Sequence, residues 1–558
     1  MSCSSACANC PQPGNDDNKN DIKSCCVGDV LLRPPPLLDV ACFVFATLEQ
    51  QYRVRLQTLF SLRCFVTEVV FPSQVQPYEV LRQIYNKRFI VYPAAIVLAH
   101  TESDVVQAIR FAREHGLPVS PRSGAHCYEP WNMQQYGIVV DQRPRQQGRV
   151  CSKQNTATLE PGMLLGRTIL LLQEGTTIPA GTAALLPGNK KKKKRRDKDR
   201  TRLPSQACSF GTCPANGVAG LSLGGGIGFL NRKLGLTLDN IESMRVALSD
   251  GRVVTASSAE HADLFFGMRG AGGNNFGIMT ELTLRTITQH WVTIFAIEWP
   301  FEGHAASVIA AWQQWAPFVS NNDLTTECNV HNRFQPVVVT GQFTTHRGAK
   351  GPMTAEACAQ EQAELLQLLE PMLRLPGRTN LMMRCVSVSD AARFFGIGNV
   401  RPPFFKNVSA FVFSPLSPAA IQTIVENMAL LGEDDAFHKV EMNALQGAVS
   451  EVPKHATAFA ARDALFWMQI TSLWSLQEQA PFQIERIQRF YDAMKPFLQH
   501  EGHLWAYANA ADAGLGVGSD RRTALVAYYG DNVDALIRVK QTYDPINLFQ
   551  FPQSIPLI

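Results

Sequence analysis

The chain has 558 residues, of which 46% are apolar and 18% charged, a composition typical of a globular protein with two or three domains. No apolar run is long enough to cross a bilayer, so we expect no membrane span. Residues 190–202 hold ten basic and two acidic residues, so the net charge of +4 leaves the rest slightly acidic. A single basic run is not a nucleic-acid surface, and we expect no nucleic-acid partner.

The N-terminal residues predict little regular structure. Residues 1–50 are expected to be disordered or weakly ordered, because the first 35 mix Cys, Asn, Asp, Pro and Gly without periodicity. Cys7 and Cys10 have the spacing of a zinc pair, but no second pair or histidine follows nearby, so we favour a disordered tail and no metal. The remaining cysteines are scattered, as in a reduced protein with occasional buried thiols. There is no clean signal peptide, which leaves the location open between secreted and cytoplasmic.

Residues 94–120 predict a strand–helix–strand unit. Ala95–Leu98 is a short apolar strand, residues 101–104 form a capping box, and apolar residues at helical spacing run up to Gly116. The second strand, at residues 117–120, opens into Arg-Ser-Gly-Ala-His at residues 122–126. A strand end followed by small residues is a common place for phosphates and cofactors. On its own, however, His126 would more often be a packed or surface histidine.

A basic segment interrupts the next part of the chain. Strands are predicted at residues 137–141 and 157–160, and a helix at residues 163–173. Residues 183–208 then carry the lysine and arginine run, which predicts a solvated loop. We interpret the segment as a surface insertion; its similarity to a nuclear-localisation signal rests on composition alone.

The glycine-rich stretch at residues 211–228 is the most informative part of the sequence. Its glycines surround Cys213 and alternate with apolar residues, which argues against a flexible linker. Exposed amides in such a stretch can hold a phosphate or a flat ring. A Rossmann fingerprint needs an acid about 20 residues further on to bind a ribose. The acid at about that distance, Asp250, lies in an Asp-Gly turn between apolar runs, where it is poorly placed for a ribose, so the stretch is not a Rossmann fingerprint.

The remaining elements predict two further layers. A strand at residues 241–248 is followed by a turn and a second strand at 253–254. A helical turn at 262–266, a second glycine stretch at 269–278 and a strand at 279–285 follow. Strand signals at residues 337–340, 408–413 and 466–472 alternate with helix signals at 418–431 and 482–498. They predict an antiparallel sheet with helices on one side and one face free for a substrate.

These motifs together resemble the berberine-bridge-enzyme-like FAD-linked oxidases, whose FAD-binding domain is of the p-cresol-methylhydroxylase type. The family's Cys-Pro-x-x-Gly-Val-x-Gly motif begins here at Cys213, and its Arg-Ser-Gly-Gly-His motif matches residues 122–126 with Ala125 replacing the second glycine. Its Arg-Gly-x-Gly-Gly-x-x-Phe-Gly-Ile motif matches residues 269–278, and residues 543–556 resemble its closing motif. The resemblance covers roughly residues 80–290 and the C-terminal part.

The resemblance implies an α+β fold: a two-subdomain FAD-binding domain plus an antiparallel-sheet substrate domain backed by helices. We expect the FAD-binding domain at residues 51–287, with the basic insertion inside it, and the substrate domain at 288–505. Residues 506–558 should return to the FAD-binding domain. In many members the corresponding histidine and cysteine are bonded to the flavin, so FAD is expected to be covalent through His126 and Cys213.

The resemblance also assigns the residues that bind FAD. A methyl group at Ala125 should be tolerated only if its φ is negative. The expected cofactor-binding residues are Arg122, Ser123, Gly124, Ala125, His126, Cys213, Gly217, Val218, Gly220, Gly225, Gly226, Gly273, Gly277, Ile278 and Asn547.

The implied activity is that of an oxidase. It would take a hydride from a C–H next to O or N of a small alcohol, carbohydrate or alkaloid-like substrate and reduce O2 to H2O2. Removing the accompanying proton needs a base near the flavin. The family's tyrosine for this task is replaced by Ala510, and a histidine common near the flavin is replaced by Leu221.

Several side chains remain candidates for the base. The strand at residues 465–474 places Trp467, Gln469 and Thr471 on one face without an acid. We select Tyr507 as the base and Gln469 as a second catalytic residue; the alternatives are Tyr128, His503 and Glu129. Because the expected catalytic groups are replaced, a flavin-binding protein with little or no turnover is the alternative function.

Overall fold

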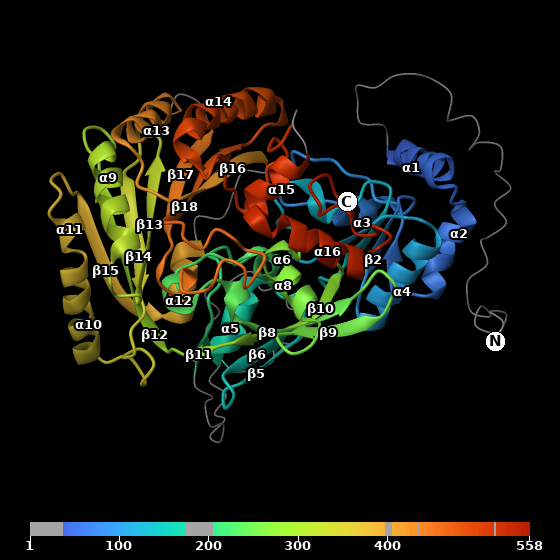
Figure 1. Cartoon of the computed structure of the whole chain (residues 1–558), viewed down its shortest axis with the longest axis horizontal. Coiled ribbons are helices and arrows are strands. Elements are labelled where there is room, and N and C mark those ends of the chain that lie inside the picture. Colours follow the sequence, from blue (N-terminus) through green and yellow to red (C-terminus); the bar gives the residue numbers. More distant parts are fainter. Residues whose placement is uncertain (1–36, 175–204, 397–403, 432–435, 518–520) are drawn as a thin grey trace.

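A computed structural model describes residues 37–174, 205–396, 404–431, 436–517 and 521–558. The Cys7/Cys10 pair and the basic run of residues 190–202 lie outside these ranges. In Figure 1 two smaller sheets from the N-terminal half lie beside one large sheet from the C-terminal half, with α6, α8, α15 and α16 between them.

The first sheet contains the predicted strand–helix–strand unit, which is confirmed. Its strand order is β1-β2-β4-β3, and β2, β4 and β3 are parallel. The side chain of Thr101 accepts a hydrogen bond from the Asp104 amide, which completes the predicted capping box. The elements are β1 (Val69–Val70), β2 (Ala95–Leu98), α4 (Glu102–Glu114), β3 (Val119–Arg122) and β4 (Ile138–Asp141).

A helix precedes this sheet where the sequence predicted weak order. Helix α1 spans Leu37–Tyr52 and is followed by α2 (Leu56–Phe60) and α3 (Val75–Leu81). Val40, Val44 and Leu48 recur every fourth residue and are buried in the same core as β2. The expectation for residues 37–50 was therefore wrong, because an apolar stripe at this spacing can bury one helix face against a neighbouring sheet.

The second sheet is antiparallel, with strand order β5-β6-β10-β8-β9. The predicted turn at Asp250 and Gly251 joins β8 to β9, and Gly251 has a φ of 80°. The strands are β5 (Gly148–Cys151), β6 (Thr156–Leu159), β8 (Ile241–Ala247), β9 (Val253–Ser257) and β10 (Ile278–Arg285). The helices associated with this sheet are α5 (Leu165–Glu174), α6 (Val218–Gly224), α7 (Asn231–Leu234) and α8 (Ala262–Ala271). The short strands β7 (Gln206–Ala207) and β11 (Ile287–Thr288) form a separate antiparallel pair.

The third sheet is the predicted antiparallel layer backed by helices. Its seven described strands have the order β15-β12-β14-β13-β17-β18-β16. They are β12 (Trp291–Trp299), β13 (Leu324–His331), β14 (Val337–Phe343), β15 (Asn380–Ser387), β16 (Phe404–Val412), β17 (Phe437–Ala444) and β18 (Phe466–Trp474). Helices α9 (Ala305–Trp315), α10 (Ala355–Leu368), α11 (Glu370–Leu373), α13 (Pro418–Leu430) and α14 (Ala480–Leu498) lie on its outer side (Figure 1). Helix α12 (Val388–Gly396) packs between α5 and the strands β12 and β15.

The two faces of the third sheet differ in chemistry. On the helix-covered face, Val440 and Ile470 pack with Trp312 and Phe490 in one apolar core. Side chains alternate between faces along a strand, so Glu441 and Gln469, which are neighbours of Val440 and Ile470 in the chain, point to the opposite side. That polar face is directed toward the FAD-binding half of the molecule.

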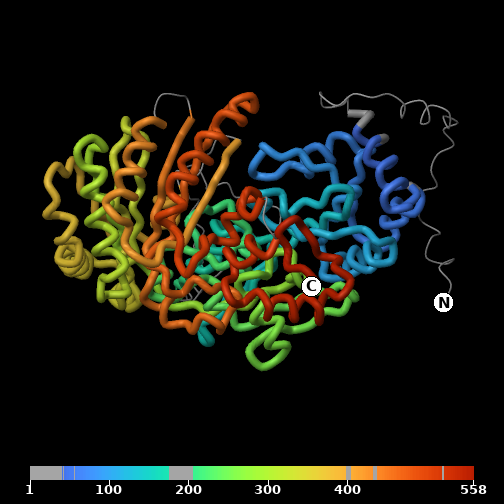
Figure 2. Tube along the Cα trace, turned by 45° about the horizontal axis from the view of Figure 1, so that its top comes forward, coloured from blue at the N-terminus to red at the C-terminus, as the bar shows by residue number. Residues whose placement is uncertain are grey.

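The C-terminal segment crosses back over the first half of the chain, as the red tube in Figure 2 shows. It contains α15 (Arg521–Tyr529) and α16 (Val533–Tyr543), preceded by the short β19 (Gln499–His500) and β20 (His503–Leu504). The Ile555 amide donates to the Asn275 side chain at 2.8 Å, and Lys540 donates to the Asn275 carbonyl at 2.8 Å. These contacts hold the C-terminal segment against the second glycine stretch.

One cysteine pair differs from the sequence expectation. Cys358 on α10 and Cys385 on β15 form a disulfide, so the picture of a wholly reduced protein is wrong for this pair. The two residues are 27 positions apart, and only the packing of α10 against the sheet brings them together. Within the described ranges, no helix has the length and apolar character of a membrane span, and no cluster of His, Cys, Asp and Glu is arranged for a metal.

Candidate active site

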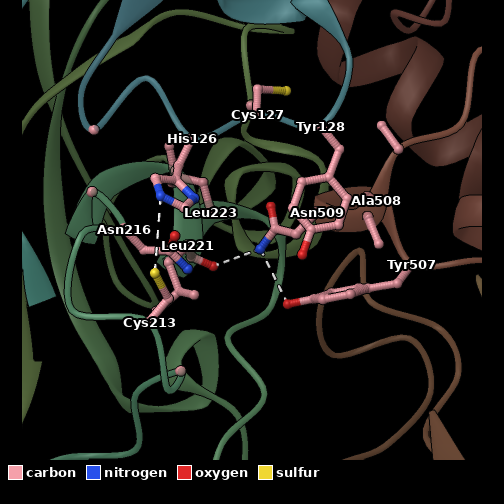
Figure 3. Close-up of a pocket in the computed structure, with 18 of the residues that line it drawn as sticks. His126, Cys127, Tyr128, Cys213, Asn216, Leu221, Leu223, Tyr507, Ala508 and Asn509 are labelled. Carbon is pink, nitrogen blue, oxygen red and sulfur yellow. Dashed lines mark hydrogen bonds between the residues drawn. The ribbon is translucent and has the colours of Figure 1, made fainter. Parts of the chain in front are cut away.

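A cavity of about 680 Å³ lies between the glycine-rich loops and the polar face of the third sheet. One wall comes from residues 121–128, 211–227 and 270–279, and the opposite wall comes from β13, β17 and β18. Residues 507–511 of the C-terminal part close one side. Figure 3 shows His126 and Cys213 on the loop side, with Tyr507 and Asn509 across from them.

The loop after β3 is held from behind by Arg122. This buried side chain donates to the carbonyls of Leu81 and Gln83, and burial lowers its pKa to about 10. Ser123 donates to the Pro161 carbonyl at 2.6 Å. Both side chains therefore position the loop by binding protein carbonyls, while the small residues that follow face the cavity.

The loop backbone corrects the expectation for Ala125. Its φ is 56°, in the left-handed region, whereas the sequence analysis required a negative value. Its carbonyl accepts a hydrogen bond from the Tyr85 amide at 2.9 Å, and the Tyr85 ring stacks on His126 with 3.6 Å between ring centroids. These contacts hold the turn in a conformation that an alanine adopts only at an energetic cost.

The two cofactor loops touch through glycine. A Cβ added to Gly124 would lie 2.3 Å from the Gly217 amide nitrogen, so no larger residue fits at this crossing. The crossing brings the Cys213 Sγ to within 3.9 Å of the His126 Nε2, as the dashed line in Figure 3 marks. The structure therefore brings together the two residues assigned as flavin anchors, which are 87 positions apart in the chain.

The loop wall fits an FAD molecule. A Cβ added to Gly220 or Gly273 would meet nothing within 4 Å, so the backbone is open to a ligand at both positions. Several buried polar atoms that line this side have no hydrogen-bond partner among the described residues: Trp131 Nε1, both Asn132 amide atoms, Asn216 Oδ1 and Asn274 Oδ1. A long polar ligand such as FAD supplies partners for such atoms.

Most of the assigned cofactor residues line the cavity, and five do not. Of the described residues assigned to FAD, those outside the lining are Val218, Gly225, Gly226, Ile278 and Asn547. Gly225 and Gly226 end α6 with φ values of 151° and 86°, and a Cβ on either would collide with Tyr507 or Thr237. They shape the turn rather than the ligand surface.

Ile278 and Asn547 also have structural roles. Ile278 opens β10, pairs with Ala247 and is fully buried in the core of the first sheet. Asn547 adopts a φ of 53° in the turn after α16, and its amide donates to the Asp544 carbonyl at 3.0 Å. Asn547 lies outside the cavity lining, and its Oδ1 is buried without a hydrogen-bond partner among the described residues, so its placement beside the flavin stays a prediction.

Tyr507 lines the cavity, and its hydroxyl oxygen is held as a hydrogen-bond acceptor. Its hydroxyl oxygen accepts from the Gly226 amide at 2.7 Å and from the Asn509 side chain at 3.1 Å. Burial raises its pKa to about 12, although these two hydrogen bonds work in the opposite direction. A tyrosine hydroxyl must be ionised before it can act as a general base, so this environment does not favour the role predicted for Tyr507.

The other proposed bases are placed differently. Tyr128 lines the cavity, as Figure 3 shows, whereas Glu129 and His503 are outside its lining. Glu129 is buried and paired with Arg88 at 3.2 Å and with Lys406 at 3.7 Å. Leu221, which stands where the family has histidine, lines the cavity and its carbonyl accepts from Asn509 at 2.9 Å.

The sheet wall contains charged residues that the sequence analysis missed. Glu327 on β13 and Lys439 and Glu441 on β17 line the cavity together with Gln469 on β18. Glu441 lies directly opposite Gln469 in the antiparallel register. The alternation of polar and apolar residues along 437–444 was the available signal, but the sequence does not show that β17 pairs with β18.

Two sequence families match the chain. Residues 93–188 match the family described as "FAD binding domain", and residues 506–556 match "Berberine and berberine like". The two matched segments include the histidine loop and the C-terminal part that closes the cavity. They lie at opposite ends of the chain but meet around the same site.

Similar proteins cover nearly the whole chain. An uncharacterized FAD-linked oxidoreductase, YgaK of Bacillus subtilis, is 31% identical over 489 residues, which cover 86% of this chain and 94% of YgaK. A xylooligosaccharide oxidase of Thermothelomyces thermophilus is 28% identical over 483 residues, which cover 84% and 88% of the two chains. The solved structure of wild-type Physcomitrella patens BBE-like 1 is 26% identical, with a TM-score of 0.72 over 90% of this chain and 99% of that one.

These similarities confirm the α+β fold with the p-cresol-methylhydroxylase type of FAD-binding domain that the motifs predicted. They agree with the cavity geometry, in which glycine loops and unpartnered polar atoms are arranged for a dinucleotide. The chain belongs to the berberine-bridge-enzyme-like FAD-linked oxidoreductases, and its cofactor is FAD.

Proposed function

We propose that this enzyme oxidises a hydroxyl-bearing carbon of a carbohydrate-like substrate and passes the electrons to O2, which gives hydrogen peroxide. Bound FAD supplies the acceptor for the hydride of the C–H bond. The protein has to bind the sugar against the flavin, orient the reacting hydroxyl and accept its proton.

The polar face of β17 and β18 is the observation that carries this proposal. Asn443, Gln469 and Thr471 present donors and acceptors to the cavity, and Trp467 presents an aromatic surface. Trp467 Nε1 is buried without a hydrogen-bond partner in the described part of the chain. A sugar, with many hydroxyls and an apolar ring face, matches a wall that combines polar groups with an aromatic ring.

The proposal includes an FAD bonded to both His126 and Cys213. Support comes from the family resemblance of the two motifs and from the 3.9 Å separation of the Cys213 Sγ and the His126 Nε2. Gly220 lines the same cavity, and a Cβ added there would meet nothing within 4 Å, which leaves space for a flat ring. Two attachment points would fix the flavin ring with respect to the sheet wall.

Anaerobic mixing with candidate substrates tests the proposed activity. Xylobiose, cellobiose and glucose form the sugar panel, with benzyl alcohol and benzylamine as controls of other classes. We expect at least one sugar to bleach the yellow flavin absorbance, and we expect readmitted air to restore it with formation of hydrogen peroxide. Bleaching by benzylamine or benzyl alcohol alone would contradict the substrate class.

A flavin-binding protein with little turnover is the second candidate. It is favoured by the replacement of the family's catalytic groups at Ala510 and Leu221. It predicts that no member of the panel bleaches the flavin, although intact FAD is present. The same experiment therefore separates the two functions.

A further inference from the structure

The imidazole of His126 is covered on one face by an aromatic ring from a separate segment of the chain. The rings of Tyr85 and His126 are stacked, with 3.6 Å between their centroids and 21° between their planes. His126 lines the cavity, whereas Tyr85 lies outside its lining. Tyr85 therefore acts on the contents of the cavity only through the orientation of the His126 ring.

From this geometry we infer that Tyr85 is a positioning residue for the covalent attachment of FAD to His126. The inference rests on the proposed bond between His126 and the flavin, and it goes beyond that bond because Tyr85 lies outside the motifs that carry the cofactor residues. The ring of Tyr85 holds the imidazole in the orientation in which a ring nitrogen meets the flavin. Tyr85 itself forms no bond to the cofactor.

The segment that carries Tyr85 is fixed to the histidine loop through its backbone. The Tyr85 amide donates to the carbonyl of Ala125, the residue before His126, at 2.9 Å. Arg122, at the start of the same loop, donates to two backbone carbonyls of residues 81–83. The two segments are thus joined at three points, which places the Tyr85 ring against the imidazole.

A second set of contacts fixes Tyr85 from the side of the third sheet. Asn86, the next residue, is buried, and its amide nitrogen donates to the Tyr128 carbonyl at 2.9 Å and to the Phe405 carbonyl at 3.0 Å. The Phe405 ring, on β16, has its centroid 5.4 Å from that of Tyr85. Tyr85 is therefore held between the histidine loop and an edge strand of the third sheet, so its ring has little freedom to turn away from His126.

The orientation of the imidazole matters because its nitrogen reacts through a lone pair in the plane of the ring. A histidine side chain has several rotamers, and only those that direct a ring nitrogen into the cavity can react with the flavin. Stacking on one face excludes the rotamers that would move the ring through the space of Tyr85. Positioning of this kind has large effects on rate, since a displacement of about 1 Å can cost about 10²-fold.

The second anchor, Cys213, is positioned by other contacts. It belongs to the other cofactor loop, in which the Asn216 amide donates to the Cys213 carbonyl at 3.1 Å. Its Sγ lies 3.9 Å from the His126 Nε2, so both anchors face the same part of the cavity. We expect the bond through Cys213 to form without Tyr85, which makes Cys213 an internal control.

The atoms and electrons of the attachment balance with O2 as the oxidant. A bond forms between a ring nitrogen of His126 and a methyl carbon of the flavin ring. One C–H bond of that methyl group and the N–H bond of the imidazole break, and both protons go to solvent. The two electrons that remain reduce FAD, and O2 takes them up with two protons to give hydrogen peroxide. Tyr85 exchanges neither protons nor electrons.

Tyr85→Ala in a Cys213→Ala background isolates the bond to His126. Each protein is purified from riboflavin-limited cells and incubated with FAD in air, and the mass of the denatured protein is followed over time. We expect FAD attachment to be about 10²-fold slower than in Cys213→Ala alone. Tyr85→Phe in the same background retains the stacked ring, so its attachment rate should be close to that of Cys213→Ala.

Two controls separate positioning from folding. In a His126→Ala background, where only Cys213 can attach, Tyr85→Ala should leave the attachment rate unchanged. Tyr92→Ala in the Cys213→Ala background is the matched control, because the Tyr92 ring contacts the Arg82 guanidinium, 4.8 Å from its centroid, and lies outside the cavity lining. Its attachment rate should equal that of Cys213→Ala, and a rate as low as that of Tyr85→Ala would overturn the specific role of Tyr85.

Each outcome is decisive. If Cys213→Ala itself attaches no FAD, the proposed His126 anchor fails and the inference fails with it. If Cys213→Ala attaches FAD and Tyr85→Ala does not slow the reaction, the inference alone is overturned. An equal loss of rate in the His126→Ala background also overturns it, because Tyr85 would then act on the whole site. A Tyr85→Phe rate as low as that of Tyr85→Ala overturns the role of stacking.

A second variant keeps the test valid if Tyr85→Ala fails to fold. Tyr85→Leu retains an apolar side chain but has no planar face to stack on His126. In the Cys213→Ala background we expect its attachment to be at least about tenfold slower. An attachment rate equal to that of Cys213→Ala would overturn the assignment.

Discussion

Ala125 shows at the scale of one residue how the cofactor site imposes a conformation on the chain. Its φ of 56° is favourable for glycine and costly for alanine. The neighbouring residues maintain it: the Tyr85 amide binds its carbonyl, and Gly124 crosses Gly217. Strain of this kind persists where the surrounding contacts determine the backbone, and it is frequent at functional sites.

Ala125→Gly is therefore expected to stabilise the protein. The relief of the left-handed conformation exceeds the extra entropy of an unfolded glycine, so the free energy of unfolding should rise by up to about 1 kcal/mol. Denaturant unfolding of the two proteins measures the difference. Gly220→Ala serves as a comparison, since its position lies open to the cavity and its φ is not positive. A lower stability of Ala125→Gly would show that the methyl group contributes packing that outweighs the strain.

At the scale of an element, α4 depends on a single buried carboxylate. The two Asp104 oxygens accept five hydrogen bonds, from the backbone and hydroxyl of Thr67, the backbone and hydroxyl of Thr101, and the His100 amide. Burial acts to raise the pKa of Asp104, but the hydrogen bonds from Thr67 and Thr101 outweigh it, and the pKa lies below its ordinary value. Asp104 thus joins the start of α4 to the segment that precedes β1 and to the turn that precedes the helix.

Asp104→Asn should lower the free energy of unfolding by at least about 2 kcal/mol at neutral pH, because the ionised carboxylate accepts charge-assisted hydrogen bonds. A carboxyl whose pKa is lowered by folding stabilises the protein above its unfolded pKa and loses that effect as the pH falls through the folded value. The stability difference between the two proteins should therefore shrink in acid. Urea unfolding at neutral and acidic pH measures it, with the exposed Asp534→Asn as a control expected to cost at most about 1 kcal/mol.

At the scale of the whole molecule, the active site is an assembly of distant segments. The histidine loop, the cysteine loop, the sheet face and residues 507–511 all contribute to one cavity. Lys406 on β16 joins three of these parts, because it pairs with Asp512 of the C-terminal segment and with Glu129 beside the histidine loop. A ligand that fills this cavity should stabilise the entire fold.

Removing both anchors tests that expectation. After denaturation, the parent and the single variants His126→Ala and Cys213→Ala should keep the mass of one FAD, and the double variant should lose it. The melting temperature of the double variant should then rise with added FAD, by the equivalent of about 2.7 kcal/mol at a hundredfold excess over the dissociation constant. A parent without attached FAD would contradict the covalent anchors. A melting temperature independent of FAD would contradict the assembly of the site around the cofactor.

Local chemistry made much of this protein predictable from sequence. Glycine loops, the capping box at Thr101 and the alternation along 466–472 each act over a few residues, so the pattern itself indicates the structure. His126 and Cys213 could be assigned for the same reason, because each lies in a short motif. The helix at Leu37–Tyr52 was missed although its apolar spacing was visible, since its charged and proline-rich neighbours obscured it.

The tertiary structure decided what depends on the pairing of distant strands. Glu441 is 28 positions from Gln469 and faces it only because β17 and β18 are neighbours in register. Likewise, the disulfide of Cys358 with Cys385 follows from the packing of α10 against the sheet. By itself, the sequence determined the cofactor and the loops that hold it, because these are local motifs. Which side chains face the substrate was decided by the fold, because strand register is a long-range property.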